Sequence, residues 1–181
     1  GNWLVLARTK FMLNDLEDTL YSQGLYYQNK FKTNREQDLY TAVNDWENLR
    51  KGVDINYDQI SRISSYMSEK HFEKNCLKYM DKDARHTMQS LRERMWLKTN
   101  DVWYNAFDNA PQKKVRYIRR MRENGEKLNS TPRITLSTIH GVKGGEQDNV
   151  VLLTDLSRNT QRNYEQNPDD ENRLFYVGAT R

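Results

Sequence analysis

Four polar side chains in a short segment between two apolar runs are the first candidates for chemistry in this chain. The segment is the middle of residues 134–153, ITLSTIHGVKGGEQDNVVLL. The four side chains are Thr138, His140, Lys143 and Glu146. The flanking runs, 134–136 and 150–153, are typical of buried strands, and the glycines between them supply turn residues. Because ligands of open α/β sheets bind at the loops leaving the strand ends, we predict that this segment forms one working edge.

The first thirty residues have the pattern of a β–α–β unit. Apolar runs at residues 3–7 and 25–28 predict two strands, and Arg8 follows the first of them. Between the runs, apolar residues recur at the spacing of an amphipathic helix that Gly24 ends. A β–α–β unit implies a parallel sheet with a right-handed crossover. Since the first strand starts at the third residue, we expect the chain to be a piece of a longer protein.

A long middle region has helical spacing of its apolar residues. The helices are expected at residues 39–49, 57–67, 72–80 and 88–96. The sequence therefore predicts an α/β sheet domain formed by residues 1–32 and 126–181, with an all-helical insert at 33–125.

A basic helix closes the predicted insert. Pro111 opens it, Gly125 ends it, and an apolar stripe runs along it at Val115, Ile118 and Met121. Its cations are Lys113, Lys114, Arg116, Arg119, Arg120 and Arg122. A DNA-facing surface and a solvated helix face explain this charge equally well.

The last part of the chain reads as a loop and a helix. Residues 157–168 are polar and predict a loop. A helix is expected to start at residues 169–171, whose three acids suit the positive end of a helix dipole. Leu174, Phe175 and Val177 are expected to pack this helix against the sheet.

Composition narrows the class of protein. A net charge of +4 favours a polyanionic partner only weakly. Cys76 is the only cysteine, which excludes an internal disulfide, and the three histidines are too far apart for a helical ligand pair, so no metal site is predicted. The sequence has no run of 18 apolar residues and no signal-peptide pattern, so we expect no membrane partner and a cytoplasmic location.

Three segments together resemble the carboxy-terminal motor domain of the UvrD/Rep-type superfamily 1 DNA helicases. LARTKFMLNDLEDTL is similar to the fourth motif of the family, a strand ending in Arg and followed by a helix. TIHGVKGGEQDNVVLL is similar to the fifth motif, TIHxxKGLEFxxVxL, and NRLFYVGATR to the sixth, RRLxYVxxTR. Gly145 and Gln147 depart from the family's Leu and aromatic residue, which alters packing beside Glu146. The resemblance implies a RecA-like sheet, of the P-loop NTPase type, with a helical subdomain inserted in it.

The resemblance also implies roles for individual residues. Arg181 is implied as the arginine finger on the γ-phosphate of ATP, with Arg8 in support. Glu146 is implied to bind the ribose hydroxyls, with Lys143 and Gly144 beside the nucleotide. Single-stranded DNA is implied to pass Thr138 and His140, with Arg173 coupling the finger to the DNA side.

The chain lacks the parts that hold the triphosphate. Neither a GxxxxGK[ST] loop nor an acidic strand end for Mg²⁺ occurs in it. The implied function is therefore that of the C-terminal part of an ATP-dependent 3′–5′ helicase acting on single-stranded DNA or a 3′-tailed duplex. The binding site for ATP and Mg²⁺ is expected to be completed by a missing N-terminal motor domain. This part alone is expected to be inactive.

Two other functions remain compatible with the sequence at this point. One is a non-catalytic module that binds nucleic acid or protein and has a helicase-like fold. The other is a nuclease of the related helicase–nuclease type, which is disfavoured because no clustered Asp/Glu/Lys site accompanies the motifs.

Overall fold

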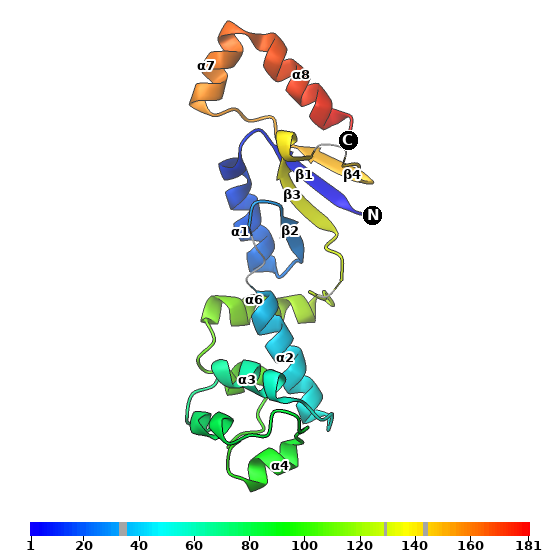
Figure 1. Ribbon diagram of the computed structural model, residues 1–181. Coiled ribbons are helices and arrows are strands. Elements are labelled where there is room, and N and C mark those ends of the chain that lie inside the picture. Colours follow the sequence, from blue (N-terminus) through cyan, green and yellow to red (C-terminus); the bar gives the residue numbers. More distant parts are fainter. Residues whose placement is uncertain (33–35, 129, 143–144) are drawn as a thin grey trace. The chain divides into compact units, whose positions relative to one another are not determined.

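The computed structural model describes residues 1–32, 36–128, 130–142 and 145–181 (Figure 1). Contacts divide the chain into two units, one of residues 1–34 and 120–181 and the other of residues 35–119. Domain limits at residues 33 and 125 stay a prediction, since a contact boundary marks compactness and does not by itself show independent folding.

The first unit contains a parallel sheet with the strand order β2–β3–β1–β4 (Figure 1). β1 (Trp3–Ala7) pairs with β3 (Ile134–Thr138) and with β4 (Asn149–Leu152), and β2 (Tyr27–Asn29) pairs with β3. This confirms the predicted α/β fold class with a parallel sheet. β4 lies at an edge, and the 38% exposure of Val151 shows that it is not the fully buried strand predicted.

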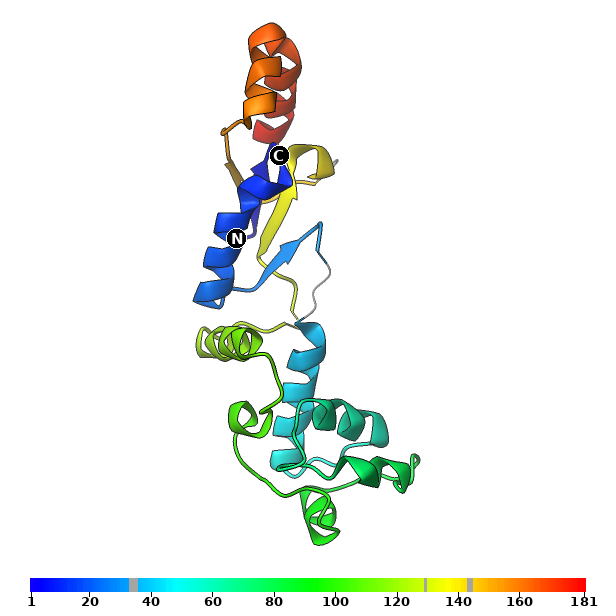
Figure 2. The ribbon, with the colours of Figure 1, turned by 90° about the vertical axis from the view of Figure 1, so that its left-hand side faces the viewer.

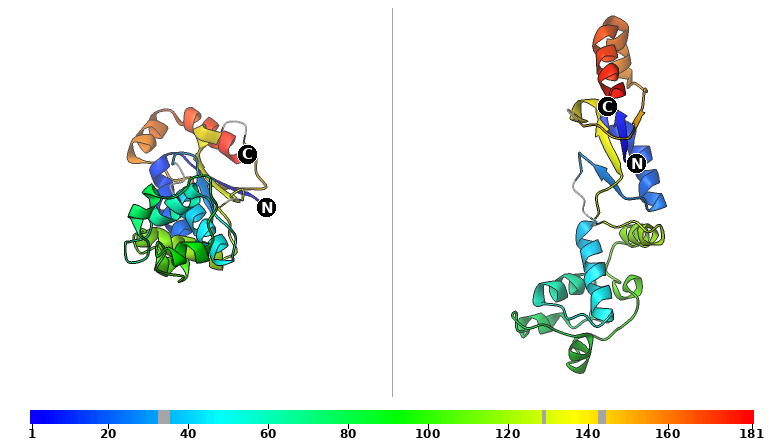
Figure 3. Two further views of the ribbon diagram at one scale, coloured as in Figure 1. Left: turned by 60° about the horizontal axis from the view of Figure 1, so that its bottom comes forward. Right: turned by 90° about the vertical axis from the view of Figure 1, so that its right-hand side faces the viewer.

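Strand β1 is buried on both faces because its apolar residues alternate between two clusters. Val5 and Ala7 pack with the side that carries α1 (Asn14–Gln23), which follows the 3-10 helix η1 (Lys10–Leu13). Leu4 and Leu6 pack with the 3-10 helix η3 (Ile139–Val142) and with residues of α8 (Pro168–Ala179). Figures 2 and 3 show α1 and η3 on opposite sides of the strands.

Helix α1 ends at Gly24, as predicted, in the left-handed conformation with φ of 70°. The N–H of Gly24 bonds to the carbonyl of Tyr21, and that of Leu25 bonds to the carbonyl of Leu20. These bonds form a C-terminal cap of the Schellman type. Because the cap occupies the N–H of Leu25, the second strand begins at Tyr27, two residues later than predicted.

The close approach of Arg120 and Met121, in the last turn of α6 (Gln112–Glu123), to the end of α1 also requires glycine at position 24. A Cβ there would lie 2.4 Å from Cβ of Arg120 and 2.7 Å from the backbone N of Met121. Asn124 donates from its side chain to the carbonyl of Gln23 at 2.8 Å, and Arg120 donates to that of Ser22. The two chain segments are therefore in backbone contact.

The second unit is built from helices around a core of fully buried side chains. Trp46, Ile60, Ile63, Met67 and Phe107 are 0% exposed. The elements are α2 (Gln37–Arg50), α3 (Tyr57–Ser65), the 3-10 helix η2 (Lys74–Lys78), α4 (Met88–Glu93) and α5 (Trp103–Ala106).

Most of the expected helices of this unit are present, with differences in type and length. The helix predicted at residues 72–80 is the 3-10 helix η2. Helix α4 ends at Glu93, earlier than predicted, because Met95 takes a positive φ of 59°. α5 has only four residues, too few to show a period in the sequence.

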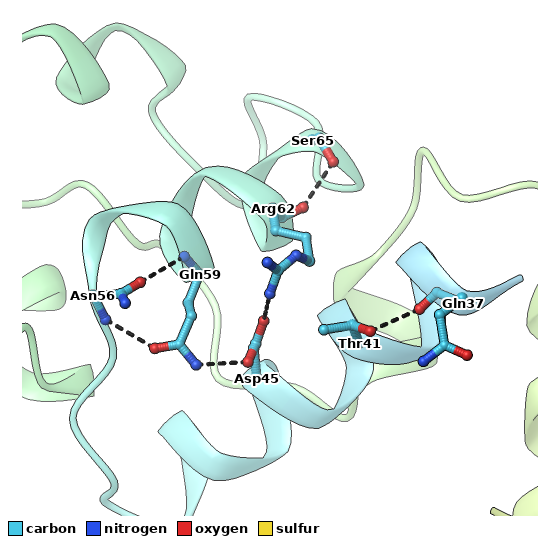
Figure 4. Close-up of polar contacts among 7 residues, drawn as sticks. All are labelled: Gln37, Thr41, Asp45, Asn56, Gln59, Arg62 and Ser65. Carbon is cyan, nitrogen blue, oxygen red and sulfur yellow. Dashed lines mark hydrogen bonds and ion pairs between the residues drawn. The ribbon is translucent and has the colours of Figure 1, made fainter. Parts of the chain in front are cut away.

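A polar network joins α2 to α3 (Figure 4). Asp45 is only 6% exposed, and its carboxylate accepts from Nε2 of Gln59 at 2.7 Å and from the guanidinium of Arg62. Gln59 and Asn56 form a reciprocal capping box at the start of α3, with bonds of 3.0 and 3.1 Å. The same Gln59 thus fixes the start of α3 and holds Asp45 of α2.

Removing this carboxylate is expected to destabilise the helical unit. Asp45→Ala leaves Gln59 and Arg62 without their shared acceptor, and we expect a loss of about 2 kcal/mol in the free energy of unfolding. The control is Glu47→Ala on the same helix, whose pair with Arg50 at 3.3 Å is of the i,i+3 kind and is expected to contribute at most about 0.5 kcal/mol. Urea unfolding of both variants measures the difference. Equal losses would contradict the assigned role of Asp45.

The C-terminal region is more helical than predicted. Residues 157–168 were expected to form a loop, but α7 (Arg158–Gln166) occupies them, capped by Ser157, whose Oγ accepts from the N–H of Thr160 at 3.1 Å. The prediction was wrong because so polar a helix shows little apolar periodicity. Helix α8 follows, and its Leu174 and Phe175 pack as expected, whereas Val177 is 37% exposed. None of the helices in the described ranges is both long and apolar enough to cross a membrane.

Candidate functional site at two edges of the sheet

The connection from β3 to β4 carries the chain from one edge of the sheet toward the other. Thr138 pairs with Ala7 at the carboxyl ends of the strands, whereas Asn149 pairs with Trp3 at the amino ends. With a rise of about 3.3 Å per residue, roughly 13 Å separate these two edges. The connection therefore runs along the length of β1, and the single working edge stays a prediction.

At the carboxyl edge, His140 is exposed and Thr138 is buried. Oγ1 of Thr138 accepts from the N–H of Gly141 at 3.2 Å and so closes the turn that begins η3. A Cβ at Gly141 would lie 2.8 Å from Oγ of Ser137, so glycine permits this tight turn. The hydroxyl of Thr138 therefore shapes the loop, and the imidazole of His140 is the accessible group.

Arg8 follows β1 at the same carboxyl edge, and Glu171 holds it with two hydrogen bonds. Nε of Arg8 donates to Oε2 of Glu171 at 2.6 Å and Nη2 donates to Oε1 at 2.8 Å. Glu171 lies in the first turn of α8 and is 6% exposed. The bonds from Arg8 lower the pKa of Glu171, and the positive charge of His140 acts in the same direction. The pKa of Arg8 is raised, mainly by its hydrogen bond to Glu171.

The lowered pKa of Glu171 gives the ion pair a definite pH dependence. A carboxyl whose pKa is lower in the folded state stabilises the fold above its ordinary value of 4.5, and this contribution is lost as pH falls through the folded pKa. We therefore expect the wild-type chain to exceed Glu171→Gln in unfolding free energy at neutral pH. The advantage should shrink as the pH falls below 4.5 and through the lowered pKa of the folded state. Urea unfolding of both proteins across this range tests the expectation, and a difference that stays constant with pH would contradict it.

Toward the amino edge, the other end of α8 meets the segment that leads into β4. The N–H of Gln147 donates to the carbonyl of Arg181 at 3.4 Å, and Asp148 accepts from the N–H of Asn2 at 2.7 Å. Glu146, next to Gln147, is exposed. Nε of Arg181 is buried, and no hydrogen-bond partner for it lies within the described residues. Glu146 and Arg181 are thus neighbours on this side of the sheet.

Arg8 is bonded to Glu171 of α8, and its predicted role beside the nucleotide stays a prediction. The eight residues from Glu171 to the end of α8 at Ala179 correspond to about 12 Å of helix. The guanidinium of Arg8 therefore lies at the edge of Thr138 and His140. Arg173 is exposed on α8, two residues beyond Glu171. Lys143 and Gly144, both predicted beside the nucleotide, lie outside the described residues.

Glu171 is the site residue whose contact the sequence reasoning missed, since it was interpreted only as an acid at the positive end of a helix. The signal that could have found it is its spacing. Residues 171, 174, 175 and 178 share one helical face. That face is buried, with Leu174 and Phe175 in the core cluster of Leu4 and Leu6. An acid on the buried face of a helix requires a cationic partner.

The basic helix α6 uses part of its charge within the protein. Lys114 lies 3.9 Å from a carboxylate oxygen of Glu36, and the guanidinium of Arg119 lies 5.0 Å from the ring centroid of Tyr104. The predicted apolar stripe is confirmed, since Val115, Ile118 and Met121 are buried. Contact of this helix with DNA stays a prediction. In the described part of the chain, no three His, Cys, Asp or Glu side chains gather as a metal site.

Comparison with known protein families identifies the family of this chain. Residues 5–181 match the family model of the UvrD-like helicase C-terminal domain. A search of curated proteins and a search of solved structures found no match. The match spans the strand that leads to Arg8, the β3–β4 connection and helix α8, and it confirms the resemblance seen in the motifs. This chain therefore belongs to the UvrD-like helicase C-terminal domain family.

Proposed function

We propose that this chain is the second motor domain of an ATP-dependent DNA helicase and supplies Arg181 to an ATP bound mainly by a first motor domain. The observation that carries the proposal is the environment of the Arg181 side chain. Its Nε is buried, yet finds no acceptor among the described residues. A buried guanidinium nitrogen without an acceptor is costly unless a ligand provides one. The γ-phosphate of ATP is such an acceptor, and a guanidinium stabilises the charge that develops on it during transfer.

Glu146 completes the nucleotide side of the proposed site. Its exposed carboxylate lies beside the segment that bonds to Arg181, and it offers acceptors for the two ribose hydroxyls. By resemblance, Lys143 and Gly144 lie next to the same nucleotide. Mg²⁺ and the phosphate-binding loop belong in this proposal to the first motor domain, so the chain alone is expected to hydrolyse no ATP.

The carboxyl edge is proposed as the track for single-stranded DNA. His140 and Arg173 are exposed and can donate to phosphate oxygens without reading bases. Thr138 contributes mainly by holding the turn that presents His140. With nucleotide at one edge and DNA at the other, closing and opening of the ATP site can move the strand along the track. The 3′–5′ polarity follows from the family resemblance.

Strand separation by the full-length protein tests the proposal. Duplexes with a 3′ tail, a 5′ tail or no tail are incubated with ATP and Mg²⁺, and unwinding and ATP hydrolysis are measured together. We expect hydrolysis to require DNA and unwinding to require the 3′ tail. DNA binding with no stimulated hydrolysis on any substrate would contradict the motor and favour the non-catalytic binding module. Unwinding only from a 5′ tail would overturn the polarity alone.

A further inference from the structure

One helix connects the Arg8–Glu171 ion pair to the proposed arginine finger. Glu171 is in the first turn of α8, and Arg181 comes two residues after its end. The side chain of Glu171 is bonded to the end of β1, and the carbonyl of Arg181 to the segment before β4. α8 is thus fixed to the sheet at both ends, by groups from two different strands or their flanks.

We propose that Glu171 is a positioning residue for Arg181, acting through α8 with Arg8 as its anchor on the sheet. This inference rests on the proposed function of Arg181 as the finger. In this proposal Arg8 supports the finger through its bonds to Glu171 and through α8.

The apolar contacts of α8 set its depth on the sheet. A Cβ at Gly178 would lie 3.0 Å from Cδ1 of Leu152 and 3.5 Å from Cγ1 and Cγ2 of Ile139, so the helix lies close to β4 and η3. Leu174 and Phe175 pack into the same core cluster. Such apolar contacts are non-directional.

The Arg8–Glu171 ion pair adds the directional hydrogen bonds that the apolar contacts of α8 lack. Two parallel N–H···O bonds of 2.6 and 2.8 Å fix both the position and the rotation of the carboxylate. Because Glu171 is almost fully buried, water screens this pair less than it screens a surface ion pair. The pair therefore fixes the register of α8 along its axis, and the register sets the reach of Arg181.

A double-mutant cycle in the full-length motor tests the inference. Glu171→Gln removes the charge and keeps the shape of the side chain. We expect the kcat of DNA-stimulated ATP hydrolysis to fall about tenfold or more, as small misplacements of a catalytic group do, with the KM for ATP within about twofold. In a background of Arg181→Ala, the same change should lower kcat no further. A loss of equal factor in both backgrounds would overturn the inference.

Two further variants separate positioning from loss of folding. Asp169→Asn removes a charge from the same first turn and should leave kcat unchanged. The exchange of charges, Arg8→Glu with Glu171→Arg, should recover most of the kcat that either single change loses; a kcat as low as that of the single variants would also overturn the inference. If Glu171→Gln does not fold, Glu171→Asp serves in its place, with the same dependence on Arg181 expected. Should Arg181→Ala itself leave kcat unchanged, the proposed function fails, which is a different result.

Discussion

Arg181→Ala in the full-length motor is expected to reduce the kcat of DNA-stimulated ATP hydrolysis by about 10³-fold or more. The guanidinium stabilises negative charge on the γ-phosphate that is greatest in the transition state, so its loss lowers kcat more than it weakens ATP binding. Steady-state hydrolysis at saturating DNA measures kcat and KM separately. The affinity for single-stranded DNA should change little, because the proposed contacts with DNA are those of His140 and Arg173.

Two substitutions serve as controls for Arg181. Arg162→Ala removes the same charge from an exposed position on α7 and should leave kcat within about twofold. Arg181→Lys keeps the charge but loses the planar fork of donors, and it should restore only a small part of the rate. If Arg181→Ala and Arg162→Ala lose the same small factor, Arg181 is not a finger.

Gly24→Ala is expected to cause the largest loss of stability among the substitutions considered. The residue combines a φ of 70° with a Cβ position only 2.4 Å from Cβ of Arg120. The left-handed conformation costs alanine about 1–2 kcal/mol, and the displacement of backbone at Arg120 and Met121 adds about 1–3 kcal/mol. We expect a loss of about 2–5 kcal/mol in the free energy of unfolding, a large share of the stability of a typical domain.

Gly125 provides the matched control for Gly24. It also follows a helix and has a positive φ of 73°, but a Cβ there would meet nothing within 4 Å. Gly125→Ala should therefore show the conformational penalty alone, about 1–2 kcal/mol. Thermal or urea unfolding of the two variants gives the difference as the contribution of the close contact of Gly24 with Arg120 and Met121. Equal losses would show that the contact can relax freely.

Much of the fold could be predicted because local patterns and long-range packing agree. Leu4, Val5, Leu6 and Ala7 are four apolar residues in a row, which indicates that both faces of the strand are buried. The sequence does not show which elements cover each face. Gly24 ends a helix by its conformation, a property of a single residue. α7 was missed because a polar helix depends on its cap at Ser157 and on packing at Thr160, and neither produces an apolar period.

The candidate site was predictable residue by residue but not as an arrangement. Motif spacing points to Glu146 and Arg181, and the structure brings both to one side of the sheet. The place of Arg8 in the sheet depends on strand register, and register depends on which strands pair across more than a hundred residues of chain. The partner of Arg8 is Glu171, 163 positions away. A single sequence carries the type of each residue but no direct signal for such a pair.

Trapping of a transition-state analogue tests most directly whether this chain lends a guanidinium to a nucleotide held by another domain. The full-length motor, bound to single-stranded DNA, is mixed with ADP, Mg²⁺ and aluminium fluoride, and retention of labelled ADP is measured. The account predicts stable trapping by the wild type and by Arg162→Ala, and loss of trapping by Arg181→Ala with ordinary ADP affinity preserved. Equal trapping by all three proteins would contradict it.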